Sequence, residues 1–124
     1  MAAELEPGQY IFCTMPTEEI DRVSGSAIGT FREREGWSAI LPFRAAQELG
    51  LPCQQPLRMI RLGVNSTLDA VGLTAAVSTA LTEIGVACNV VAASHHDYLF
   101  VLAADADRAM QRLDTLSANA RAPR

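Results

Sequence analysis

Residues 57–117 follow a fixed order of strand-type and helix-type segments, which restricts the folds open to the chain. An apolar, partly β-branched run at residues 57–64 is typical of a strand. Apolar residues then recur at helical spacing over residues 69–84, and Gly85 is well placed to end that helix in a left-handed turn. Two further strands and a second helix are predicted to follow, at residues 86–93, 97–103 and 105–117.

The first half of the chain shows the same order, although its residues do not repeat those of the second half. A strand at 10–15 is followed by a polar loop with one expected helical turn, a hairpin at 27–42 and a short helix at 43–50. This order, which occurs once in each half of the chain, is typical of ferredoxin-like folds. We therefore predict an α+β fold of two βαββα modules that can interleave, with antiparallel sheets covered by helices on one face. The expected boundaries are residues 1–56 for a degenerate N-terminal module, 57–117 for a C-terminal module and 118–124 for a disordered tail.

The charge composition argues against several classes of protein. The chain has 124 residues, a net charge of −4 and no lysine, and its ten basic residues are scattered arginines. Nucleic-acid binding requires a basic stripe that neutralises phosphates, so we expect no nucleic-acid partner. No apolar run approaches the ~20 residues that span a bilayer, and the acidic N-terminus does not resemble a secretory signal. Three widely spaced cysteines favour a reducing cytoplasm, in which thiols serve as small core residues.

The two histidines of the chain, His95 and His96, are adjacent and precede Asp97. Such a group can form a metal site, can move protons, or can lie at the polar tip of a hairpin. Adjacent residues on an extended chain point to opposite faces, and no spacing typical of zinc ligands is present. We therefore expect a hairpin tip, with no metal ion and no cofactor. No cysteine has an evident base beside it, and the charged stretch at 32–36 is interpreted as a solvated hairpin tip.

The predicted helix start at residues 69–73 can receive a ligand carboxylate, because the first N–H groups of a helix lack partners and carry partial positive charge. Gly72 in that turn lets either a ligand or a neighbouring backbone come close. Asp69 either holds a ligand's amino group or favours the helix dipole. Asn89 lies in an otherwise apolar strand, where its side chain needs a hydrogen-bonding partner, water or a ligand.

The segment "STLDAVGLTAAVSTALTEIGVACNVVAASHHDYLFV" (residues 66–101) resembles the ACT domain, the small regulatory module of aspartate kinases and other amino-acid enzymes. The resemblance is carried by the loop before Asp69, by "VGL" at the helix start, by "TEIGVACNVVAAS" and by the "DYLFV" strand. It is strongest for the aspartate-kinase type and for small stand-alone bacterial proteins with two such modules. In the first half, "GTFREREGWSAILP" is also similar to these stand-alone proteins.

The resemblance implies a regulatory module that is not itself a catalyst. It also implies a homodimer in which an amino acid lies between the strand-end loop and helix start of one module and a strand of its partner. Mapped onto this sequence, the ligand-binding residues are Asn65, Asp69, Val71, Gly72, Leu73, Asn89 and Val90. The C-terminal module lacks a closing strand, and we expect residues 10–15 to fill that place. The alternative is a protein–protein interaction or oligomerisation module that has no ligand pocket.

Overall fold

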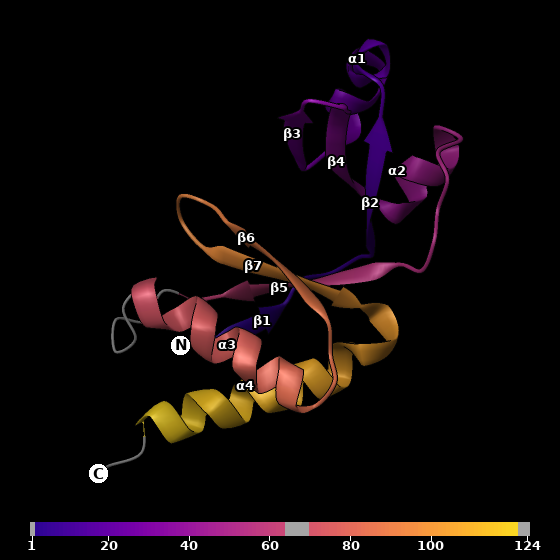
Figure 1. Cartoon of the computed structure of the whole chain (residues 1–124). Helices are drawn as coiled ribbons and strands as arrows, with labels where there is room; N and C mark the ends of the chain where they lie inside the picture. The colour runs from indigo at the N-terminus through magenta and orange to yellow at the C-terminus, as the bar shows by residue number, and fades with distance from the viewer. Residues whose placement is uncertain (1, 64–69, 122–124) are drawn as a thin grey trace. The chain divides into compact units, whose positions relative to one another are not determined.

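The computed structural model describes residues 2–63 and 70–121 of the chain, which divides into two compact units. The N-terminal unit is Gly8–Leu57, and the C-terminal unit is Met1–Pro7 together with Arg58–Arg124. Each unit has a sheet, helices and a hydrophobic core of its own (Figure 1). The first residues of the chain thus belong with its second half. The expected boundary between residues 56 and 57 had assigned them to the N-terminal module.

The N-terminal unit has three antiparallel strands in the order β3-β4-β2, and Tyr10 of β2 also pairs with Leu57. β2 (Tyr10–Met15) and β3 (Gly29–Glu33) each pair with β4 (Gly36–Pro42). The helical segments are α1 (Ile20–Val23), α2 (Phe43–Glu48) and the 3₁₀ turns Thr17–Glu19 and Ser24–Ser26. The strand, hairpin and short helix predicted for this half are confirmed, and the polar loop forms more helical turns than the one expected.

Alternation along these strands gives the N-terminal sheet one apolar face. Cys13 lies opposite Ala39 in the β2–β4 register, and both side chains are buried. Val23 of α1 and Ala46 of α2 belong to the same core and are fully buried. The alternating residues of these strands point to the opposite face of the sheet; they include Phe12, Thr14, Phe31, Ser38 and Ile40.

The C-terminal unit has β7 (Asp97–Leu102) between β5 (Leu57–Leu62) and β6 (Cys88–Ala92), with β6 and β7 antiparallel. The helices α3 (Ala70–Glu83) and α4 (Ala106–Arg121) lie side by side and cover one face of this sheet (Figure 1). A 3₁₀ turn, Ala103–Asp105, leads into α4. The core between the sheet and the helices includes Ile60, Leu62, Val77, Leu81, Leu99, Val101, Ala109 and Leu113. The prediction of an α+β, ferredoxin-like fold is confirmed.

Helix α3 ends as its sequence predicts. Gly85 has a φ of +73°, and the Val86 N–H donates to the Leu81 carbonyl oxygen at 2.9 Å. A glycine in the left-handed region satisfies the last carbonyl groups of a helix without the steric cost of a Cβ atom. The predicted helix start, with Ser66 and Asp69 as a capping pair, lies outside the described residues.

The closing strand of the C-terminal unit is β1 (Ala3–Leu5), so the prediction that residues 10–15 fill that place is wrong. Ala3 lies opposite Leu62 and Leu5 opposite Ile60, and both residues pack against the C-terminal core. Residues 10–15 pair along their whole length with β4, whereas their described pairing with β5 is the single pair Tyr10–Leu57.

Helix α4 continues to Arg121, whereas the expected tail begins at residue 118. Three of residues 118–121 are alanine or arginine, which are among the best helix formers, and this accounts for the longer helix. Among the helices described, none has the length and apolar character needed to cross a bilayer.

Candidate functional site

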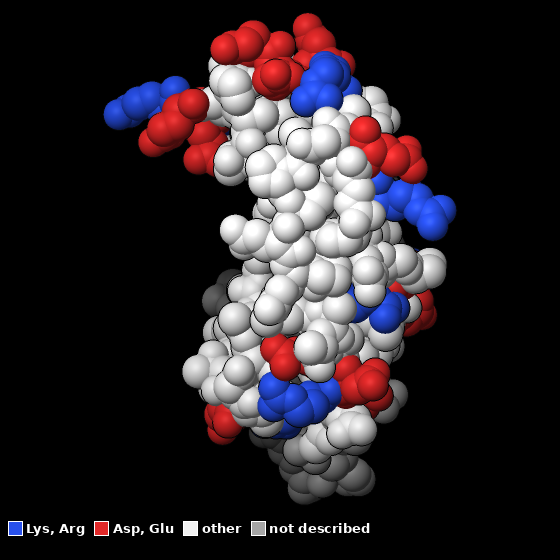
Figure 2. All heavy atoms as spheres, turned by 90° about the vertical axis from the view of Figure 1, so that its right-hand side faces the viewer, with Lys and Arg blue, Asp and Glu red and all other residues white. Residues whose placement is uncertain are grey.

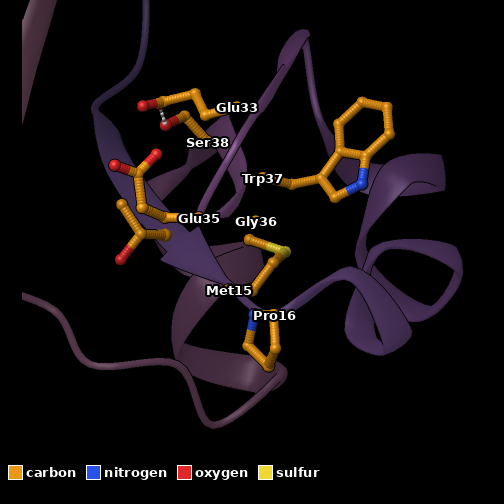
Figure 3. A pocket seen from close by; sticks show the side chains of 8 residues that line it. Met15, Pro16, Glu33, Glu35, Gly36, Trp37 and Ser38 are labelled. Carbon is orange, nitrogen blue, oxygen red and sulfur yellow. Dashed lines mark hydrogen bonds between the residues drawn. The ribbon is translucent and has the colours of Figure 1, made fainter.

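A hollow of about 470 Å³ lies where β2 ends and β4 begins, and we call it the strand-end pocket. Its lining comes from the end of β2, the β3–β4 turn and the start of β4: Thr14, Met15, Pro16, Glu33, Glu35, Gly36, Trp37 and Ser38. Figure 3 shows Glu33, Glu35 and Ser38 on one side of Gly36 and the indole ring of Trp37 on the other. The pocket therefore offers two carboxylates on one side of Gly36 and an aromatic ring on the other.

Gly36 allows the start of β4 to lie close to the end of β2. Its φ is +147°, and a Cβ atom built on it would lie 2.4 Å from the Met15 carbonyl oxygen. Real Cβ atoms do not approach a backbone oxygen so closely, and side-chain-bearing residues rarely adopt this φ. The start of β4 thus lies directly against the last residue of β2, and only glycine permits that contact.

The polar groups of the pocket differ in whether they have a hydrogen-bonding partner. The Ser38 hydroxyl donates a hydrogen bond to a carboxylate oxygen of Glu33, which fixes the direction of that side chain. The Trp37 Nε1–H is buried and finds no acceptor within the described residues. An unpaired buried donor of this kind costs about 1–3 kcal/mol. None of the lining residues that the structure describes is basic, and two of them are glutamates, so their summed charge is negative.

The ligand-binding residues predicted in the C-terminal unit are only partly described. Asn65 and Asp69 lie outside the described residues, and Val71 lies in the first turn of α3. Gly72 and Leu73 are half-buried in the same helix, and Leu73 packs against the C-terminal core.

Asn89 and Val90 lie on opposite faces of β6. Val90 is half-buried and packs against the core on the helix side, where Leu73 also lies. Asn89 is exposed and lies opposite Phe100 in the β6–β7 register, on the face turned away from the helices. Within one chain, therefore, the sheet separates the Asn89 side chain from the α3 residues predicted to act with it.

His95 and His96 lie in the turn that joins β6 to β7, where a hairpin tip was predicted. His95 is exposed, and the Ala93 N–H donates to the His96 carbonyl oxygen. The half-buried His96 ring meets the Tyr98 ring edge-on, with 6.1 Å between the ring centroids. Across the described part of the chain, no three His, Cys, Asp or Glu side chains gather in a way that could hold a metal ion.

The three cysteines are free thiols. Burial raises the pKa of the Cys13 thiol, and the neighbouring Cys53 thiol raises it further. Burial also raises the pKa of Cys88. Because the thiolate is the reactive form, these shifts disfavour nucleophilic chemistry at Cys13 and Cys88.

Two ACT-domain models match the sequence, one over residues 1–58 and the other over residues 53–115. The chain belongs to the ACT-domain family. Each half of this ACT-domain protein thus carries one module, and ACT modules are regulatory domains. No protein with a curated description matches the sequence.

This ACT-domain protein is similar to several solved structures. A Vibrio cholerae protein of unknown function, described as a possible transport protein, is 41% identical, with a TM-score of 0.83 over 92% of this chain and 88% of that chain. Aspartokinase alpha and beta subunits give a TM-score of 0.64 at 12% identity, covering 93% and 96% of the two chains. A putative C-terminal regulatory domain of Porphyromonas gingivalis aspartate kinase gives 0.59 at 14% identity, covering 92% and 94%. The last two likenesses concern the fold.

The strand-end pocket has a definite place in the N-terminal ACT unit. β2 is its first long strand and leads directly into helical turns, as β5 leads toward α3 in the other unit. The pocket therefore lies at the strand end of the N-terminal unit that corresponds to residues 65–73 of the C-terminal unit. The solvated hairpin tip predicted at residues 32–36 is confirmed, because Glu33 and Glu35 are exposed in the β3–β4 hairpin, but the hollow that they border was not predicted. The signal available was Gly36-Trp37, a glycine and the single tryptophan directly after the charged turn.

Charged side chains elsewhere on this ACT-domain protein are mixed in sign. On the face shown in Figure 2, basic and acidic side chains are interspersed and the basic ones form no continuous stripe. Arg61 of β5 forms ion pairs with Glu4 and Glu6, which tie the segment around β1 to the sheet. The hydrogen bond from Arg61 to Glu4, together with the charges of both carboxylates, raises the pKa of the Arg61 guanidinium.

Proposed function

We propose that this ACT-domain protein is a cytoplasmic regulatory or sensor protein that binds a small molecule, an amino acid, and has no catalytic activity of its own. The observation that carries the proposal is the strand-end pocket, a hollow with two carboxylates at the strand end of an ACT unit. Family membership supports the regulatory role.

The chemistry of the lining suits the ammonium group of an amino acid. Glu33 and Glu35 can accept charge-assisted hydrogen bonds from it, and these are stronger than bonds between neutral groups. The indole ring of Trp37 lines the hollow from the other side of Gly36, where it also packs against the N-terminal core. Because no lining residue is basic, the ligand carboxylate would be met by backbone N–H groups or by water.

A second site is proposed in the C-terminal unit, between two copies of the chain. Asn65, Asp69, Val71, Gly72 and Leu73 would come from one copy, and Asn89 with Val90 from the other. The exposure of Asn89 on the face turned away from α3 supports this arrangement, since that side chain is free to meet another copy. Leu73 and Val90 pack into the core, so their backbone groups would contact the ligand.

Thermal denaturation in the presence of each of the twenty amino acids at millimolar concentration tests the proposal. A ligand at about 100 times its Kd stabilises the folded state by about 2.7 kcal/mol, which raises the Tm by several degrees. The Glu35→Gln variant should lose most of this rise. The matched control is Glu48→Gln, an exposed carboxylate on α2 of the same unit, which should keep the rise. No change with any of the twenty amino acids would refute amino-acid binding.

The alternative, an interaction module without a ligand, is favoured by one observation. The large hydrophobic side chains that stand exposed among the described residues are Ile28 and Phe31, and both lie at β3. A protein that self-associates through β3 and ignores every small molecule tested would have this function instead.

A further inference from the structure

Two thiols from different segments of the chain lie in the core of the N-terminal unit. Cys13 in β2 is 5% exposed, and Cys53 is half-buried in the segment between α2 and β5. Both side chains belong to the hydrophobic cluster that also contains Met15 and Leu41. Neither thiol takes part in the proposed function. One core thus contains two groups that oxidation can join by a single bond.

The segment after α2 turns the Cys53 side chain toward this core. The Leu51 N–H donates to the Ala46 carbonyl oxygen at 3.0 Å, which ties the start of the segment to α2. Leu51 and Cys53 both pack against the N-terminal core, whereas Pro52 between them is exposed. Because alternate residues of an extended chain point to the same side, the Cys53 side chain follows that of Leu51 inward.

The Cys13 and Cys53 thiols also interact electrostatically. Burial raises the pKa of the Cys13 thiol, and the Cys53 thiol raises it further. Such an interaction weakens as the separation of the two groups grows, so it indicates that the thiols are neighbours. Both are free thiols, and the Cys53 S–H donates to the Leu51 carbonyl oxygen at 3.3 Å. A thiol is a weak donor, so this hydrogen bond costs little to break.

We propose that Cys13 and Cys53 are a redox-sensitive pair, which a low-molecular-weight disulfide oxidises to a bond between β2 and the segment at residues 50–56. This pairing is independent of ligand binding. Cytoplasmic thiols are normally kept reduced, so the pair would close only when the pool of small disulfides rises. The third cysteine, Cys88, packs against the C-terminal core and takes no part.

The reaction consists of two thiol–disulfide exchanges. Cys53 is the more exposed thiol and reacts first: its thiolate attacks one sulfur of the small disulfide, forms a mixed disulfide and releases one small thiol. Cys13 then gives its proton to solvent, and its thiolate attacks the Cys53 sulfur and displaces the second small thiol. The two protein thiols thereby lose two electrons and two protons, which the small disulfide takes up as it becomes two thiols.

The bond would enclose residues 14–52, which include β3, β4, α1 and α2. A disulfide stabilises a protein mainly by restricting its unfolded chain, and the gain increases with the length of the loop that it closes. The bond would also hold residues 50–56 against β2, whose last residue, Met15, lines the strand-end pocket. Oxidation would therefore stabilise the folded form of the unit that contains the pocket.

Peptide mapping of the full chain tests the pairing directly. The reduced protein is incubated with glutathione disulfide at mildly alkaline pH, where more of each thiol is ionised, and the remaining thiols are blocked with iodoacetamide. Trypsin cleaves after arginine, which puts Cys13, Cys53 and Cys88 on separate peptides, residues 1–22, 45–58 and 62–108. We expect the oxidised chain to lack the mass of two hydrogen atoms and to yield the first two peptides as one linked species.

Three single variants separate the steps. Cys13→Ala should keep one glutathione on Cys53, because no second thiol displaces it. Cys53→Ala should yield no linked peptide, and the matched control Cys88→Ala should close at the wild-type rate. A main product linked through Cys88 would overturn the proposal. So would a wild-type chain in which Cys53 stays free, or stays bound to glutathione, without linking to Cys13.

Thermal denaturation shows whether the bond forms in the folded unit. Oxidation should raise the Tm of the wild-type protein by roughly 10 °C, and dithiothreitol should reverse the rise. The same treatment should leave the Tm of Cys53→Ala unchanged. A linked wild-type chain with an unchanged or lower Tm would contradict the proposal, because the bond would then form only by disturbing the packed core.

Discussion

Replacement of Gly36 by alanine tests the close approach of β4 to the Met15 backbone, on which the strand-end pocket depends. The φ of +147° at this position lies where side-chain-bearing residues are strained, which costs about 1–3 kcal/mol. The added Cβ would also lie 2.4 Å from the Met15 carbonyl oxygen, a backbone atom that cannot rotate away. Met15 itself is held by its pairing with Trp37 and by a buried side chain, so β2 would have to move as a strand.

We expect Gly36→Ala to lower the free energy of unfolding by about 3 kcal/mol or more, the backbone strain and the displacement of β2 taken together. A small domain has about 5–15 kcal/mol of stability in all, so the loss should be large in any denaturation curve. The midpoint of guanidinium unfolding, followed by the fluorescence of Trp37 beside the substitution, measures it.

The control is Gly25→Ala, which has no atom within 4 Å of the added Cβ and an ordinary φ. This variant should change the stability by no more than about 0.5 kcal/mol. If Gly36→Ala unfolds at the same midpoint as Gly25→Ala, the close approach of β4 to Met15 is absent from the protein and the pocket argument fails with it.

Three further predictions concern the two cores and the pocket. Leu81→Ala should lower the free energy of unfolding by about 2–5 kcal/mol, because Leu81 is fully buried in the C-terminal core, and circular dichroism during urea unfolding measures the loss. Ser38→Ala should cost less than about 1 kcal/mol of stability yet weaken ligand binding, since it frees the Glu33 carboxylate; calorimetric titration that finds equal affinity would contradict this. Stability should fall as the pH rises above about 9, because burial raises the pKa of the Cys13 thiol in the folded chain and the unfolded chain ionises first. Unfolding midpoints at pH 7 and pH 10 measure the fall, and the Cys13→Ala variant should show a smaller one.

Local patterns predicted the elements of this protein well. The apolar spacing before Gly85 and the turn residues around the β3–β4 hairpin act over a few positions, and the structure confirms both. The resemblance to ACT domains was visible because its motifs are contiguous in the C-terminal half. Periodicity and capping therefore determine which segments become strands and helices.

Contacts between distant residues could not be predicted in the same way. Glu4 and Arg61 are 57 positions apart, and a three-residue strand such as β1 is too short to show a periodicity. The strand-end pocket depends on the approach of Gly36 to Met15, and neither residue alone indicates that the two meet. Glu33 and Glu35 are exposed, as the interpretation of a solvated tip predicted from their charge, and the hollow that they border became evident only in three dimensions.

The central claim is that the strand-end pocket binds an amino acid, and an equilibrium titration followed by Trp37 fluorescence tests it most directly. The single tryptophan lines the pocket, so its signal reports occupancy without a label. For the amino acid that raises the Tm most, we predict a saturable change in wild type and binding at least about tenfold weaker in Glu35→Gln, from the loss of a charge-assisted hydrogen bond. A fluorescence that stays constant with all twenty amino acids, or equal affinity in wild type and Glu35→Gln, would contradict the claim.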